Sequence, residues 1–243
     1  MDLTAGQRRD VTARLKPLLA RHRIEAIPQY EQFLKALQQR VSRGLTREDL
    51  EWMYTSYDRF RADLFEWAVP DGRPLLRTVS EQQSRNLEEV FRKEDNKSLR
   101  TLQGSVSKRL DERTRKMLAM AEDWVGPLST AQAARISPFT RALPDNTQPG
   151  LWHYRRATPA GTLDAASTSC IVRCHEPGIT SDVRPAGYQT APASYREMVG
   201  ELRASLTLLL LEADRLLTLQ QRQKAITCIQ RLIDDLHVLS LGS

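Results

Sequence analysis

The chain has 243 residues, of which 40% are hydrophobic and 27% charged, with a net charge of +6. This length suits one large or two small domains, and the charge density suits long helices with solvated outer faces. Three cysteines exclude a disulfide framework, and no run of about 18 apolar residues predicts a membrane-spanning helix. The opening residues 1–4 lack the apolar segment of a signal peptide, so we expect either a cytosolic protein or a mature form without its leader.

A capping signature recurs five times along the chain. A hydrophobic residue is followed by Ser or Thr, two further residues, and then Gln or Asp. This pattern predicts a capping box, in which the hydroxyl accepts from the N–H three residues later and the amide or carboxylate accepts from the N-cap N–H. Each box contributes about 1 kcal/mol and predicts a helix start. The five segments are Leu3–Gln7, Leu45–Asp49, Val79–Gln83, Leu128–Gln132 and Leu217–Gln221.

Apolar residues then recur at intervals of three and four, as in amphipathic helices. We expect the first helix to run from Thr4 to near Gly44, with a kink at Pro28. The second should stop at 70–72, where the sequence reads Pro-Asp-Gly. A single long helix should follow Ser80 and end at 126–127.

A fourth helix should start at Ser129 and lose regularity near Pro138. Two further apolar stripes, separated by a short turn at 217–218, predict a C-terminal antiparallel hairpin that packs on the first region. The expected fold is therefore all-α, with long antiparallel helices in an extended or curved bundle. Its parts are a long-helix region at 1–143, an irregular segment at 144–192 and the hairpin at 193–243.

The segment 144–192 departs from the helical pattern. It holds six of the twelve prolines, four of the eleven glycines and two of the three cysteines. A structureless run of this length is unusual inside a compact domain. It is either a long functional loop or a stretch foreign to its surroundings, such as one read in a shifted frame. In the second case we expect it to be poorly ordered and the first site of limited proteolysis.

Residues that could support catalysis or metal binding are sparse. Cys170, Cys174 and His175, with His153 upstream, offer soft ligands, but the second well-spaced pair of a structural zinc site is missing. Neither His22 nor His237 has a nucleophile or carboxylate at a motif spacing, and no phosphate-binding loop or nucleophile elbow occurs. We therefore expect no enzyme, no cofactor and no metal.

Aromatic residues crowd the second helix. They are core residues of the bundle or, alternatively, an apolar face that binds partner proteins. The candidate partner-binding face comprises Tyr54, Tyr57, Phe60, Trp67 and Trp124.

Basic residues support a second interpretation. They gather on the first helix, between Arg8 and Arg23, and again between Lys108 and Lys116, where Asp111 and Glu112 interrupt the group. The alternative function is a basic helical protein that binds nucleic acid or anionic surfaces. Because the excess charge is small and dispersed, we do not expect nucleic acid as the main partner.

The capping signature resembles the LTxxQ motif of the Spy and CpxP group of periplasmic chaperones, most closely at Leu3–Gln7 and Leu217–Gln221. The order of several segments is also similar to an uncharacterised family of proteobacterial helical lipoproteins, a domain of unknown function, over 1–143 and 193–243. These segments are Leu3-Thr4-x-x-Gln7, His22-Arg23-x-Glu25-x-Ile27-Pro28-x-Tyr30-x-x-Phe33-Leu34, Leu45-Thr46-x-Glu48, Trp124-Val125-Gly126-Pro127-Leu128-Ser129-x-x-Gln132 and a final Leu-Thr-x-x-Gln helix.

The resemblance implies an exported, lipid-anchored, all-helical protein in the periplasm or tethered to the outer membrane. From the apolar helical face, we expect partners among other proteins. Contact with a membrane would come only through a lipid anchor that this chain does not carry. The segment 144–192 departs from the family, in which a charged helix would continue after Ser129.

Overall fold

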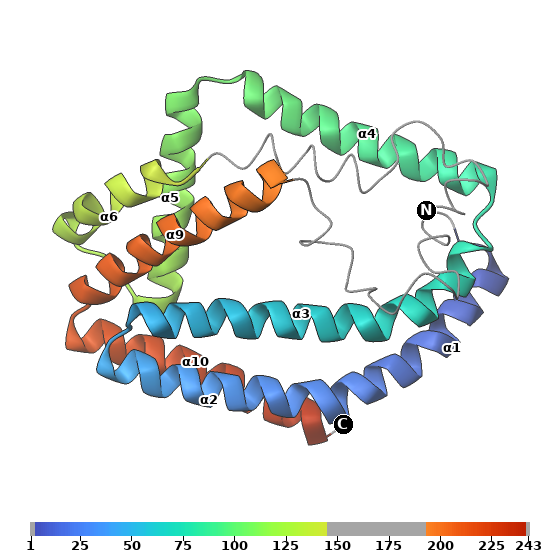
Figure 1. Ribbon diagram of the computed structural model, residues 1–243, viewed down its shortest axis with the longest axis horizontal. Coiled ribbons are helices and arrows are strands. Elements are labelled where there is room, and N and C mark those ends of the chain that lie inside the picture. Colours follow the sequence, from blue (N-terminus) through green and yellow to red (C-terminus); the bar gives the residue numbers. More distant parts are fainter. Residues whose placement is uncertain (1–2, 145–192, 242–243) are drawn as a thin grey trace. The chain divides into compact units, whose positions relative to one another are not determined.

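A computed structural model describes residues 3–144 and 193–241 (Figure 1). All the secondary structure in these two stretches is helical, and no strand occurs in them, so the expected all-α class is confirmed. None of the described helices is apolar enough over a sufficient length to cross a membrane. The helices are α1 (Ala5–Arg21), the π-helical turn η1 (His22–Ala26), α2 (Ile27–Arg43), α3 (Arg47–Leu76), α4 (Glu81–Gln103), α5 (Val106–Val125), α6 (Thr130–Ala142), α9 (Ala193–Leu216) and α10 (Leu219–Leu241).

All five predicted capping boxes are present. In each box the backbone N–H of the Ser or Thr donates to the Gln or Asp side chain, at 2.9 to 3.0 Å. The N–H three residues later donates to the Ser or Thr hydroxyl, at 3.2 to 3.3 Å. The boxes start α1, α3, α4, α6 and α10, as the sequence predicts.

The first helical stretch runs from Ala5 to Arg43, and its irregularity lies just before Pro28. The N–H of Ile27 donates to the carbonyl of His22, five residues earlier, which makes η1 a π-turn. Because proline has no N–H, the helix loses a bond at this point, and the wider turn absorbs the mismatch. The stretch ends at Gly44, whose φ of 93° favours glycine.

The expected end of the second helix at 70–72 is wrong, and the loss of regularity expected near Pro138 does not end α6. α3 continues through Pro70 and Pro74 to Leu76, and α6 continues through Pro138 to Ala142. Pro70 and Pro74 are four residues apart, so the two backbone hydrogen bonds that they remove lie on the same side of α3. The exposed residue Glu66 carries one of the affected carbonyls, where water can replace the missing donor.

The single long helix expected after Ser80 is also wrong. α4 ends at Gln103 and α5 begins at Val106, with Gly104 and Ser105 between them. Glycine disfavours the helix interior more than any other residue except proline. Ser105 takes an extended conformation, with ψ of 129°. The end of α5 agrees with prediction, at Gly126 with φ of 85°.

The chain divides into two compact units that alternate along the sequence. Among the described residues, 3–19, 61–103 and 193–198 belong to unit 1, and 20–60, 104–144 and 199–241 belong to unit 2.

Two apolar clusters stabilise unit 2. In the first, α10 packs along α2, which lies beside it (Figure 1), and the buried residues are Val41, Ala225, Ile229 and Ile233. In the second, α5, α6 and α9 meet around the buried residues Ile136, Leu143 and Leu209. The turn between α9 and α10 is as short as expected, yet the two helices bury their apolar stripes in different clusters.

The expected irregular segment 144–192 lies outside the described residues except for Pro144. Cys170, Cys174, His175 and His153 lie there as well.

Candidate functional site

The glutamines of two capping boxes pair with each other in unit 2. The amide nitrogen of Gln132 donates to the side-chain oxygen of Gln221 at 2.7 Å, and the amide nitrogen of Gln221 donates back at 3.2 Å. Gln132 also donates to the carbonyl of Leu216 at 2.7 Å, and Gln221 to that of Pro127 at 2.9 Å. The pair therefore joins the turn before α6 to the turn before α10.

A second pair of the same kind occurs in unit 1. The amides of Gln7 and Gln83 bond reciprocally at 3.1 and 2.7 Å, and Gln7 donates to the carbonyl of Thr78 at 2.7 Å. This pair joins the first turn of α1 to the start of α4. In both pairs, a glutamine side-chain amide donates to the backbone carbonyl that lies two residues before the N-cap residue of the partner's capping box.

These four glutamines are buried, and their polar atoms are engaged within the chain. Each side-chain oxygen accepts from its own N-cap N–H and from the partner amide. An amide so fully bonded has little capacity left for a ligand. The repeated signature is therefore a structural device in this chain.

A buried ion pair ties the same end of unit 2 together. Asp214, at the end of α9, lies 2.7 Å from the Arg222 guanidinium and accepts from the N–H of Leu45 at 3.0 Å. Arg222 also donates to the carbonyl of Val41 at 2.6 Å. The exposed fractions of these two charged side chains are 8% and 18%, so their charges are matched inside the protein.

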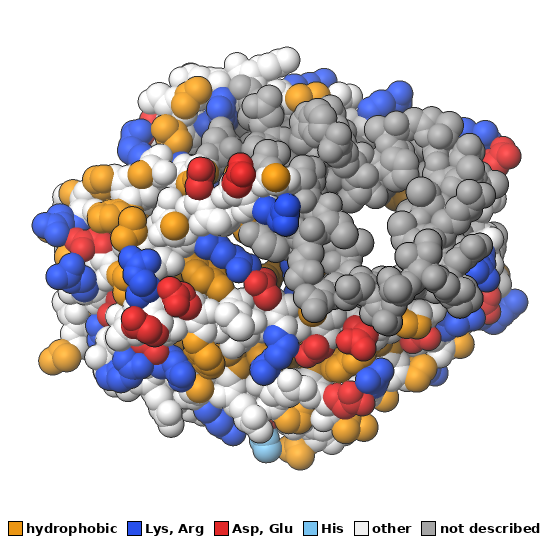
Figure 2. Space-filling model, in the orientation of Figure 1, with side chains coloured by type: hydrophobic (Ala, Val, Ile, Leu, Met, Phe, Trp, Pro, Cys, Tyr) orange, Lys and Arg blue, Asp and Glu red, His pale blue; other side chains and the backbone are white. Residues whose placement is uncertain are grey.

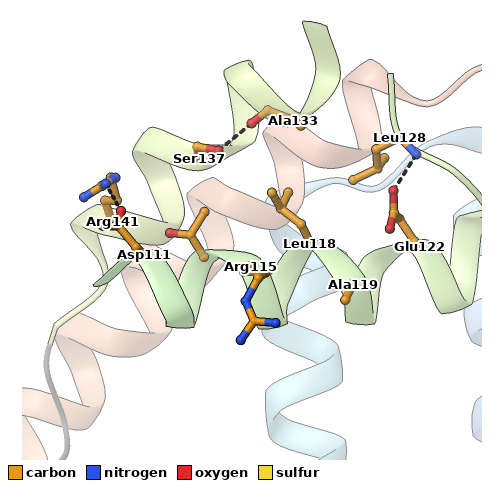
Figure 3. A pocket seen from close by; sticks show the side chains of 10 residues that line it. Asp111, Arg115, Leu118, Ala119, Glu122, Leu128, Ala133, Ser137 and Arg141 are labelled. Carbon is orange, nitrogen blue, oxygen red and sulfur yellow. Dashed lines mark hydrogen bonds and ion pairs between the residues drawn. The ribbon is translucent and has the colours of Figure 1, made fainter. Parts of the chain in front are cut away.

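A concavity of unit 2 lies between α5 and α6 (Figure 3). Its volume is about 460 Å³. It exists because α6 presents the small side chains of Ala133 and Ser137 toward α5, one helical turn apart. We call it the α5–α6 groove; it is lined by Asp111, Thr114, Arg115, Leu118, Ala119, Glu122, Leu128, Ala133, Ser137 and Arg141.

The charged groups at both ends of the groove are already engaged. Asp111 and Arg141 form an ion pair at one end. At the other end Glu122 accepts from the N–H of Leu128 at 3.0 Å. Between them lie the apolar side chains of Leu118 and Leu128, which continue into the core cluster. The centre of the groove therefore offers apolar surface rather than a polar binding site.

Arg115 also lines the groove and, unlike Asp111 and Arg141, forms no ion pair with another described residue, although its charge helps to lower the pKa of Glu112. It is exposed, and its side chain points away from α6 (Figure 3). An apolar ligand with an acidic group at its edge would complement this arrangement.

A pair of threonine hydroxyls connects the two helices beneath the groove. Thr114 of α5 and Thr140 of α6 lie 2.7 Å apart, and Thr140 donates to the carbonyl of Ser137 at 2.8 Å. Thr114 is therefore the donor between the two hydroxyls. Thr140 has no exposed surface, so this bond fixes the distance between the helices at one point.

Two of the candidate partner-binding residues contact neighbouring helices. Phe60 packs edge-on against Tyr30 and Phe33, with ring centroids 4.8 and 5.5 Å apart. The hydroxyl of Tyr54 lies 3.5 Å from the Arg203 carbonyl and from the Thr207 hydroxyl of α9. Both residues are half-buried in the packing of α3.

The other candidates differ in exposure. Tyr57 is 62% exposed on α3 and Trp124 is 43% exposed on α5. Trp67 is half-buried and belongs to unit 1. Within unit 2, Tyr54 and Phe60 thus take part in the packing of α3, whereas Tyr57 and Trp124 are exposed.

Groups that could hold a metal are absent from the described residues, where no three His, Cys, Asp or Glu side chains converge. His22 packs against Tyr30 with ring centroids 5.5 Å apart, and the Nδ1 of His237 lies 3.8 Å from Glu31. The thiol of Cys228 is half-buried near the carbonyl of Asp123.

The basic residues of α5 bond mostly within the chain. Arg113 donates to the carbonyls of Leu143 and Pro144 at the end of α6, at 2.8 and 3.2 Å. Arg109 donates to the carbonyl of Gly104 at 2.8 Å. Lys116 lies 2.8 Å from Glu112, and its ammonium hydrogen bond and charge hold the pKa of that carboxyl below its ordinary value. On the face shown in Figure 2, acidic and basic side chains are interspersed.

Asp49 is the capping-box residue that replaces glutamine. Burial raises the pKa of its carboxyl, but hydrogen bonds from Thr46 and Arg43 outweigh this, so the pKa lies below its ordinary value. The Arg40 guanidinium lies 3.0 Å from the same carboxylate and 3.9 Å from the centroid of the Trp52 ring. Arginines thus take the place of a partner amide at this helix start.

Comparison with known proteins identifies a family. A model described as a family of unknown function (DUF6279) matches residues 1–163. The chain belongs to this family. The matched residues include four of the five capping boxes and both helices of the α5–α6 groove. No curated protein and no solved structure matches the chain.

Proposed function

We propose that this member of DUF6279 is a non-enzymatic protein of the cell envelope that binds other proteins in a chaperone-like manner. The observation that carries the proposal is the α5–α6 groove, with its apolar centre and the exposed side chain of Arg115 at its edge. An extended segment of a partner could place an apolar side chain over Leu118 and Leu128 and an acidic side chain beside Arg115.

Exposed apolar side chains on the opposite side of α5 support protein binding separately from the groove. Met120 and Trp124 lie one helical turn apart on α5 and are 57% and 43% exposed. Exposed apolar surface of this kind occurs at protein-binding sites. The envelope location rests on the resemblance of the ordered segments to helical lipoproteins, and the chaperone-like role on the resemblance to the LTxxQ motif.

An aggregation-suppression assay tests the binding function. The full chain should reduce light scattering from an unfolded client, and no suppression at stoichiometric excess would contradict the proposal. Ala133→Arg, which fills the groove, should weaken suppression. Ala134→Arg is the matched control, because residue 134 is exposed on the same helix and does not line the groove.

Cell fractionation tests the location separately. Expressed from its complete gene, the protein should appear in the periplasmic or outer-membrane fraction. Recovery in the cytosol would refute the location and leave the binding assay unaffected.

The alternative, a nucleic-acid binder, has less support in unit 2. The arginines and lysines of α5 are largely engaged by carbonyls and carboxylates of the chain itself. Binding to nucleic acid should fall steeply with salt because counterions are released. Tight, salt-sensitive binding to a DNA duplex, with no client suppression, would favour the alternative.

A further inference from the structure

One face of α1 combines cations with leucines and contains no acidic residue. Residues seven apart on a helix point in nearly the same direction, and three such pairs cover about 120° of α1. All six side chains are exposed. We call this surface the basic face of α1; it comprises Arg8, Arg9, Thr12, Leu15, Lys16 and Leu19.

The charges of this face are not matched within the described chain. No described residue forms an ion pair with Arg8, Arg9 or Lys16, whereas Arg21, further along α1, pairs with Glu25. Asp10, the acidic residue of α1, lies on the opposite side of the helix. The positive charge is therefore available to an external anionic group.

The leucines distinguish between possible anionic partners. Leu15 and Leu19 are 44% and 55% exposed and lie one turn apart, among the cations rather than on the opposite side. A phosphate backbone in water gives no reason to expose leucines. A bilayer surface accepts both groups, because leucines enter the boundary between headgroups and acyl chains while long basic side chains reach the phosphates.

We infer that the basic face of α1 binds the surface of an anionic phospholipid bilayer. The helix lies in the plane of the interface, with Leu15 and Leu19 inserted and Arg8, Arg9 and Lys16 contacting phosphates. This contact requires no lipid anchor. It is separate from the α5–α6 groove and does not depend on the proposed protein-binding function.

Co-sedimentation with vesicles tests the inference. The full chain should bind vesicles of phosphatidylglycerol mixed with phosphatidylcholine and should not bind vesicles of phosphatidylcholine alone. The variant R8E/R9E/K16E should lose affinity by on the order of a hundredfold. The matched control R47E/K224E/R231E changes the net charge equally at exposed positions outside α1 and should keep most of the binding.

The leucines provide a second, independent test. Leu15→Gln/Leu19→Gln leaves the charge unchanged and should still weaken binding to anionic vesicles at least tenfold. Far-UV circular dichroism of each variant verifies that it is folded. Equal losses in the two charge variants, or full binding by the leucine variant, would overturn the inference. Binding to a DNA duplex that exceeds binding to the vesicles would do the same.

Discussion

The side-chain amides of Gln132 and Gln221 bond to each other in both directions, although the residues are 89 positions apart in the chain. Each amide belongs to a capping box, so the start of α6 and the start of α10 are stabilised by the same two side chains. Truncating either glutamine leaves buried polar groups of its partner and of the adjoining turn without a bond.

Gln132→Ala and Gln221→Ala should each lower the free energy of unfolding by about 2 kcal/mol, since each leaves unpaired groups behind. The double variant should lose about 1 kcal/mol less than the sum, because the two residues share bonds. Urea denaturation followed by circular dichroism measures both quantities. Gln223→Ala, at an exposed position on α10, should change stability by less than about 0.5 kcal/mol. Strict additivity would show that the amides act independently.

The hydroxyl pair of Thr114 and Thr140 predicts an asymmetric response. Thr114→Val removes the donor to a fully buried hydroxyl and should cost about 1 to 2 kcal/mol. Replacing both residues by valine removes both polar groups and should cost no more than the single change. A double variant destabilised by the sum of the single effects would refute this account.

Gly44 and Gly200 should respond to alanine in opposite directions. Gly44 has a φ of 93°, which strains any other residue, so Gly44→Ala should destabilise by about 1 kcal/mol or more. The added methyl would find ordinary contact, 3.5 Å from Asp214, so strain rather than space is the cause. Gly200 lies within α9 with open space around it, and Gly200→Ala should stabilise by up to about 1 kcal/mol. Thermal midpoints of the two variants would be compared with that of the natural chain.

The Asp49 carboxylate predicts a dependence of stability on pH. Its pKa in the folded protein lies below its ordinary value of about 3.9, so its stabilising effect is complete above that pH and is lost as pH falls through the folded pKa. The urea concentration at the midpoint of unfolding should therefore decrease for the natural chain once the pH is below about 4. The midpoint of Asp49→Asn should decrease less over the same pH range. Glu112→Gln is the control, because that carboxylate is exposed in its pair with Lys116. Equal pH profiles for Asp49→Asn and the natural chain would contradict the assignment.

Helix starts could be predicted from the sequence because a capping box is local. Thr4 and Gln7, or Ser129 and Gln132, complete their reciprocal bonds within one turn. The pairing of the glutamines was not predicted from the sequence, because the pairing joins distant segments. Its one signal in the sequence is that each capping glutamine has side-chain N–H donors that its own capping box does not use. Helix ends were predicted less well, since Pro70 lies inside α3, where water can replace the lost bond, whereas α4 ends just before Gly104.

The candidate site shows the same limit. Periodicity indicates which side chains share a helix face, but not which other helix covers that face. Tyr54 and Phe60 lie against α9 and α2, while Tyr57 remains exposed on the same helix. The α5–α6 groove arises from small side chains on two helices, and only their packing together reveals it.

The pairing of Gln132 with Gln221 also bears on how this chain can vary in length. The helices between them, α6 and α9, are held together by Ile136, Leu143 and Leu209 and by the Arg135–Glu212 ion pair at 2.7 Å. Because these contacts hold α6 and α9 to each other directly, the length of chain that joins Pro144 to Ala193 is not what keeps the two helices together. The chain should therefore accept insertions and deletions between these two helices without loss of α6 and α9.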